Sequence, residues 1–224
     1  MRNKFDMQLE SLHEQLIHMG ELCEIAINRA TDALKEGNTA RAREVIAADV
    51  EIDQMEKDIE RLCLKLLLQQ QPVARDLREI SAALKMITDM ERIGDQTADI
   101  AEIIITGDLT ELADVGKIGE MAQASAKMVR DSVVAYVNKD LELARQVMEA
   151  DDTVDEMFEQ VRDEALKMIS EGKDGNMAID LIMVSKYLER IGDHATNIAE
   201  WVEFSITGNH HGAQAIHDRE KAGE

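Results

Sequence analysis

The sequence predicts an all-α protein built from two tandem antiparallel three-helix bundles that are related by an internal duplication. Three observations lead to this prediction. The 224-residue chain has one proline, 12 glycines and 3% aromatic residues, a composition that favours long helices over strands. Apolar residues recur with the three-and-four spacing of helices that face a bundle core. The third observation is a motif that occurs twice in the chain.

Both copies of this motif read Glu-Arg-Ile-Gly-Asp, followed after three residues by a further acid or amide and Ile-Ala-Glu, and they begin at Glu91 and at Glu189. Upstream, an acidic block that ends at Asp53 recurs as a block that ends at Asp155. We therefore expect two three-helix repeats followed by a mobile polar tail, which cover residues 1–108, 109–208 and 209–224.

The expected helices end where Gly37, Pro72 and Gly107 interrupt the chain, because glycine caps a helix and proline breaks one. The turns are short, so that neighbouring helices should be antiparallel. The predicted helices cover residues 6–35, 39–70, 73–105, 112–137, 141–170 and 177–206.

The chain carries 25 lysine and arginine residues against 46 aspartate and glutamate residues, a net charge of −21. It has no basic run that could neutralise nucleic-acid phosphates, which excludes a simple nucleic-acid binder. Cys23 and Cys63 stand far apart without a metal-binding spacing, in agreement with a reducing compartment. No apolar run has the length of a signal peptide or of a transmembrane segment, so we expect a cytoplasmic protein.

Acidic side chains recur one helical turn apart in both repeats. With 3.6 residues per turn, Glu91, Asp95 and Asp99 lie on one quarter of their helix, opposite Ile93 and Ile100. The matching positions are Glu189, Asp193 and Asn197 in the second repeat, and Asp49, Asp53, Asp151 and Asp155 in the two preceding helices. In each repeat, the acidic residues of the two helices lie at similar distances along the chain from the turn that joins them, so we expect them at similar heights. Each bundle should therefore present a patch of four carboxylates.

Like charges one turn apart destabilise a helix by about 0.2–0.5 kcal/mol per pair, so a bound cation would offset a real cost. Oxygen ligands suit hard cations, and helical bundles hold iron or manganese through carboxylates on facing helices. Structural zinc is less favoured, because no cysteine or paired histidine accompanies these positions. The residues alone leave open a metal site or an acidic face that binds water and a basic partner.

Gly94 and Gly192 lie in the middle of their predicted helices, where glycine costs about 0.5–1 kcal/mol relative to alanine. We expect close helix packing at both positions. Arg92 and Arg190 should pair with the acidic face or with a partner.

The sequence predicts no enzymatic activity, because it lacks a P-loop, a Ser/His/Asp order and a glycine-rich dinucleotide turn. A ferritin-like di-iron enzyme needs two Glu-x-x-His motifs, and this chain has one, from Glu10 to His13. We expect His13 and His18 at the surface, and His194 pointing away from the carboxylates.

The double motif resembles that of the PhoU family, accessory and regulatory proteins of bacterial phosphate-specific transport. The resemblance extends from Phe5 to Gly208 and implies two three-helix bundles related by a pseudo-twofold, a homodimer, and metal clusters. Iron is the expected metal, with manganese, zinc and magnesium as alternatives. The implied ligands are Asp49, Asp53, Glu91, Asp95 and Asp99 in one site, and Asp151, Asp155, Glu189, Asp193 and Asn197 in the other.

The resemblance also implies a role. Such a protein represses the phosphate-starvation (Pho) response and limits phosphate uptake by contacting the ATPase subunit of the phosphate ABC transporter and a membrane sensor histidine kinase, partners that would bring it to the inner membrane. Asp99 stands where the family usually has asparagine, and Gln96 stands opposite His194, so the two sites should differ in charge and occupancy. The alternative is a PhoU-like regulator or scaffold of a different transporter without stable metal binding.

Overall fold

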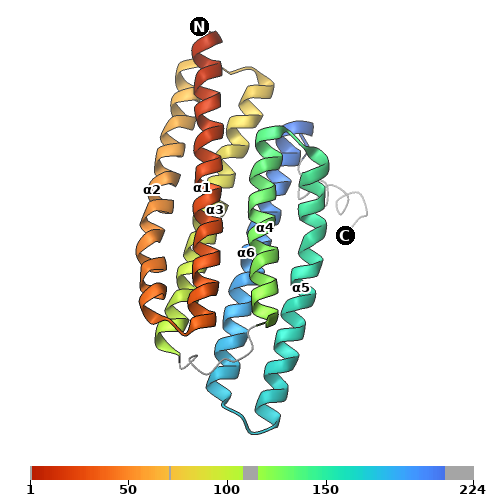
Figure 1. Cartoon of the computed structure of the whole chain (residues 1–224). Coiled ribbons are helices and arrows are strands. Elements are labelled where there is room, and N and C mark those ends of the chain that lie inside the picture. Colours follow the sequence, from red (N-terminus) through yellow and green to blue (C-terminus); the bar gives the residue numbers. More distant parts are fainter. Residues whose placement is uncertain (1, 71, 108–115, 210–224) are drawn as a thin grey trace, which may run out of the picture.

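The computed structural model describes residues 2–70, 72–107 and 116–209, and these residues form six helices and no strand (Figure 1). The first repeat contains α1 (Arg2–Glu36), α2 (Thr39–Gln70) and α3 (Ala74–Thr106), and the second contains α4 (Gly116–Asn138), α5 (Leu141–Ser170) and α6 (Gly175–Thr207). The predicted all-α fold is confirmed. The expected helix start at residue 112 and residues 210–224 of the expected tail lie outside the described residues.

Most helix bounds follow from residues that stop or start a helix. Gly37 has the predicted left-handed conformation, with φ of 57°, and Gly208 ends α6 with φ of 82°. α6 begins two residues before the predicted start, because Asp174 caps it by accepting a hydrogen bond from the Asn176 backbone N–H. α1 also begins earlier than expected, at Arg2.

The two bundles lie side by side, with α3 and α6 packed against each other as antiparallel neighbours (Figure 1). Their register is fixed by four contacts. These pair Arg78 with Gly208, Asp89 with Asn197, Asp99 with Tyr187, and Gly107 with Asp180. From one contact to the next, the step along α3 and the step back along α6 have almost the same number of residues. Gly94 therefore lies level with Gly192. Both copies of the repeated motif therefore lie at the same height.

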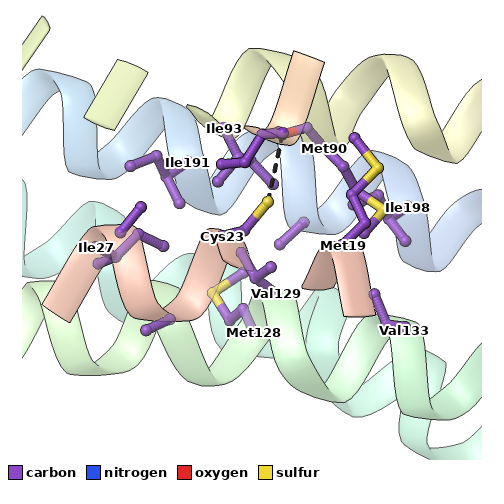
Figure 2. Close-up of a cluster of buried hydrophobic side chains, with 14 of the residues drawn as sticks. Met19, Cys23, Ile27, Met90, Ile93, Met128, Val129, Val133, Ile191 and Ile198 are labelled. Atoms are coloured by element: carbon purple, nitrogen blue, oxygen red, sulfur yellow. Dashed lines mark hydrogen bonds between the residues drawn. The ribbon is translucent and has the colours of Figure 1, made fainter. Parts of the chain in front are cut away.

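A single hydrophobic core extends through both repeats. Figure 2 shows Cys23 of α1 among Met90 of α3, Met128 and Val129 of α4, and Ile191 of α6. The Cys23 thiol donates a hydrogen bond to the Met90 carbonyl oxygen at 3.4 Å. Both cysteines are free and buried.

Methionines fill much of this core. Met86, Met90 and Met128 are buried, and Met148, Met157 and Met168 pack against the core from its edge. Met183 is different, because 41% of it is exposed.

None of the helices in the described part of the chain has an apolar stretch that is long enough to cross a membrane.

Candidate metal site

The first carboxylate cluster lies between α2 and α3, and the structure brings together the five residues predicted for it. Burial raises the pKa of Asp49 to about 6, and the charges of its neighbours add to the effect. Those neighbours are, in order of effect, Asp53, Asp95, Glu91 and Asp99. The two helices therefore hold five carboxylates within electrostatic reach of one another.

Gly94 allows α2 to approach α3 at this cluster. A Cβ atom at position 94 would lie 2.5 Å from Oδ1 of Asp49 and 3.2 Å from Cδ1 of Ile52. The same Asp49 oxygen is buried and has no hydrogen-bond partner in the described residues. The expected close helix packing is thus confirmed, and it directs an unsatisfied carboxylate oxygen toward the backbone of α3.

The second cluster repeats this arrangement between α5 and α6. Burial raises the pKa of Asp151 to about 6, with further contributions from the charges of Asp193, Asp155 and Glu189. The pKa of Asp193 is also raised, first by burial and then by Glu189 and Asp155. Packing at Gly192 is looser, since a Cβ atom there would lie 3.3 Å from Oδ1 of Asp151.

Basic side chains partly neutralise both clusters. Arg92 pairs with Asp95 at 3.0 Å and with Glu91 at 3.5 Å, which confirms its predicted pairing. In the second cluster, Lys186 pairs with Glu189 and lies 5.2 Å from the centre of the Phe158 ring. One oxygen of Glu189, Oε2, is nevertheless buried without a hydrogen-bond partner among the described residues.

Asn197 and His194 lie at the seam between the repeats. The Asn197 amide donates to Oδ1 of Asp89 at 3.2 Å, and Nδ1 of His194 lies 2.9 Å from the same oxygen. His194 was expected to point away from the cluster carboxylates, and its partner Asp89, on α3, belongs to neither cluster. The sequence did not predict this contact between the repeats. At the equivalent place on the other side, Tyr187 lies beside Asp99. Arg190 lies over the Tyr187 ring, 5.9 Å from its centre.

A second buried polar group, Glu79, was not predicted. It is 5% exposed, and its carboxylate lies 2.9 Å from Nε2 of His13 and 2.8 Å from Nζ of Lys139. The expectation that His13 is a surface residue was therefore wrong, whereas His18 is exposed as expected. Nothing in one sequence with 46 acidic residues distinguishes Glu79 from the others.

The chemistry of the clusters fits a hard cation. All the donors of the first cluster are carboxylates, their charges repel one another, and Asp49 presents an oxygen without a partner. The side chains are not, however, arranged as a complete coordination site. Among the residues that the structure describes, no three histidine, cysteine, aspartate or glutamate side chains converge as metal ligands. Binding would require the carboxylates to rotate toward a common point.

A model of the PhoU domain matches residues 16–104 and again residues 118–202, so that this domain occurs once in each repeat. A phosphate-specific transport system accessory protein PhoU homolog from Clostridium acetobutylicum is 39% identical over 210 residues, which are 92% of this chain and 96% of the relative. A homolog of the same description from Aquifex aeolicus is 40% identical over 189 residues, 84% of this chain and 86% of the relative.

Two solved structures have the same fold. The crystal structure of PhoU from Pseudomonas aeruginosa superposes with a TM-score of 0.83 at 33% identity, over 92% of this chain and 100% of that one. The phosphate transport system regulatory protein PhoU from Streptococcus pneumoniae superposes with a TM-score of 0.86 at 25% identity, over 92% of this chain and 98% of that one.

Proposed function

Because the chain belongs to the PhoU family, we propose that it is an accessory protein of phosphate-specific transport that negatively regulates phosphate uptake and the phosphate-starvation response. The observation that carries this proposal is that the family domain occurs in both repeats, together with the name of the relatives that match nearly the whole chain. The description of the Streptococcus pneumoniae neighbour as a regulatory protein supports the same role.

The proposed mechanism is non-enzymatic and relies on protein contacts. A cytoplasmic homodimer would bind the ATPase subunit of the phosphate ABC transporter and a sensor histidine kinase, and these partners would hold it at the inner membrane. The net charge of −21 and the two acidic clusters suit partners with basic surfaces, because complementary charge accelerates association and selects the partner.

The role is tested by deleting the gene and by measuring association with the purified ATPase subunit and kinase at high and low phosphate. We expect deletion to increase phosphate uptake and Pho reporter expression when phosphate is plentiful, and we expect phosphate-dependent binding to at least one partner. Unchanged uptake together with no binding to either protein would contradict the proposal and favour the alternative, a regulator of a different transporter.

We further propose that the two carboxylate clusters bind cations, with iron as the first candidate and manganese, zinc and magnesium as alternatives. Asp49, Asp53, Glu91, Asp95 and Asp99 would hold one site. The second would use Asp151, Asp155, Glu189, Asp193 and, after it turns away from Asp89, Asn197. A bound cation would supply positive charge where the carboxylates repel one another. The unpartnered oxygen of Asp49 and the raised pKa values of Asp49 and Asp151 support this proposal.

Metal content is best measured by elemental analysis of a chain that ends at residue 209, since the tail contains His210, His211 and His217. Replacing Asp95→Ala together with Asp193→Ala should abolish uptake of iron and manganese and leave the helical circular dichroism unchanged. The matched control is Asp32→Ala with Glu149→Ala, two exposed acidic residues outside the clusters. Retention of the metal by the Asp95/Asp193 variant would show that the ligands are assigned wrongly.

A further inference from the structure

Exposed aliphatic side chains gather where α2 ends and α3 begins, at one end of the molecule (Figure 1). Leu68 is 82% exposed and Val73 67%, while Leu64 and Leu77 are each 46% exposed. Leu64 and Leu68 are four residues apart on α2, and Val73 and Leu77 are four residues apart at the start of α3, so each pair lies on one side of its helix. We call this surface the basic tip and define it by Leu64, Lys65, Leu68, Val73, Arg75 and Leu77.

The charge of the basic tip is opposite to that of the whole chain. Lys65 and Arg75 are exposed, and neither forms an ion pair with any residue in the described ranges. Asp76 is the one acidic residue in the sequence from Arg61 to Leu77, whereas the chain as a whole has a net charge of −21. The four aliphatic side chains are therefore accompanied by two positive charges that form no ion pair within the described residues.

The start of α3 adds a further positive feature. Its N-cap residue is Val73, which makes no side-chain hydrogen bond to the first turn. The first backbone N–H groups of a helix have no partner within the helix, and they form the positive end of its dipole. Among the described residues no side chain is hydrogen-bonded to these groups, and Asp76 is the acidic residue of this first turn, so the groups can accept an anion from outside the protein.

The equivalent tip of the second repeat, between α5 and α6, has the apolar exposure but not the unpaired positive charge. It also exposes aliphatic side chains, among them Leu166, Ile169 and Ile179. Both of its lysines, however, pair with Glu171, Lys173 at 2.9 Å and Lys167 at 3.9 Å. Asp174 caps the start of α6. Each tip also contains the carbonyl end of one helix, α2 at the basic tip and α5 at the other. The two tips therefore share apolar exposure and differ in positive charge.

We propose that the basic tip docks on an anionic phospholipid surface. Leu64, Leu68, Val73 and Leu77 would enter the interfacial region, while Lys65, Arg75 and the first turn of α3 contact headgroup phosphates. This inference is independent of metal binding and of the proposed transport partners.

The acidic clusters do not oppose this contact. Asp53 precedes Leu68 on α2 by about 22 Å, given a rise of 1.5 Å per residue. At physiological ionic strength the Debye length is about 8 Å, so the cluster lies more than two screening lengths from the lipid when the tip touches it.

The test is flotation of the full chain with vesicles of phosphatidylcholine alone or mixed with phosphatidylglycerol. We expect binding to the anionic vesicles that weakens as salt is added, and no binding to phosphatidylcholine. Lys65→Gln with Arg75→Gln should weaken partitioning at least tenfold, since each basic residue near an anionic surface contributes appreciably. Leu68→Gln with Val73→Gln should weaken it similarly, and both variants should keep the unfolding temperature because these side chains are exposed.

The matched control is Leu166→Gln with Ile179→Gln at the α5–α6 tip, which should bind anionic vesicles like the unmodified chain. Absence of binding by the unmodified chain would overturn the proposal, as would an equal loss in the control variant. The proposal would also be wrong if the unmodified chain did not bind vesicles and the basic-tip variants lost a contact with the ATPase subunit or the kinase. The tip would then be a protein-docking surface.

Discussion

The fold destabilises the charged form of Asp49, and a bound cation would relieve this destabilisation. Its buried Oδ1 has no hydrogen-bond partner in the described residues, and four neighbouring carboxylates repel its charge. Its pKa of about 6 in the folded protein lies above the ordinary value of 3.8. The folded state thus binds a proton more tightly than the unfolded state. Asp49 consequently contributes stability at low pH that is lost as the pH rises from about 4 through about 6.

We predict that Asp49→Asn raises the free energy of unfolding of the metal-free protein by about 1 kcal/mol at pH 7.5, after allowance for solvent screening, because the amide is never charged. At about pH 4 the two proteins should differ little, since Asp49 is then protonated in the native state. Urea unfolding in the presence of a chelator, followed by circular dichroism, measures both values. An equal difference at the two pH values would contradict this account, and the exposed Asp32→Asn serves as the control.

At this scale, the sequence predicts contacts within one helix better than contacts between helices. Helix geometry alone places Glu91, Asp95 and Asp99 on one side, and the structure agrees. The contact of His194 with Asp89 depends on how α6 packs on α3, which the periodicity of α6 does not specify.

Among the elements, the turn between α4 and α5 is tied to the first repeat through Glu79 of α3. Lys139, in this turn, has a φ of 54°, the left-handed conformation that Gly37 has in the first repeat. Its side chain pairs with Glu79, and the Tyr136 hydroxyl donates to the Glu79 carbonyl oxygen at 2.7 Å. Burial would raise the pKa of Glu79, but hydrogen bonds from His13 and Lys139 outweigh it and lower that pKa.

Replacing Glu79→Ala should lower the free energy of unfolding by about 2–3 kcal/mol at pH 7, because it leaves His13 and Lys139 without their buried partner. Lys139→Gly should cost much less, since glycine relieves about 1 kcal/mol of left-handed strain while a partly exposed ion pair is lost. Denaturant unfolding measures both. Because the pKa of Glu79 is lowered, its contribution is present above its unfolded value of 4.5 and is lost below it. Equal costs for the two variants would refute this ranking.

Helix bounds were predictable where glycine or proline interrupts the chain, and less so where a polar cap begins a helix. The bounds of α2 and α5 agree with the prediction. For α6, the apolar pattern begins at Met177, but the capping Asp174 starts the helix two residues earlier.

For the whole molecule, duplication predicts two bundles but not how they join. The join is extensive, because α1 and α4 also pack closely. A Cβ atom on Gly20 would lie 3.1 Å from Cγ2 of Val133, and Arg130 pairs with Glu24 at 2.7 Å. Buried residues of both repeats belong to one continuous core. The boundary predicted at residues 108 and 109 lies outside the described residues. The two repeats share their interior, and each supplies part of the surface that buries the other.

A fragment of residues 1–107 should therefore fail to form a rigid native state by itself. Separation would expose Met19, Cys23, Met90 and Ile93, which the second repeat helps to cover (Figure 2). Exposure of apolar area costs roughly 25 cal/mol per Å², which is enough to cancel the small net stability of one domain. We expect the fragment to keep much of its helical signal, to bind a hydrophobic dye and to melt gradually, whereas the full chain melts in one sharp transition. A fragment that melts as sharply as the full chain and binds no dye would show that each bundle is stable without its neighbour.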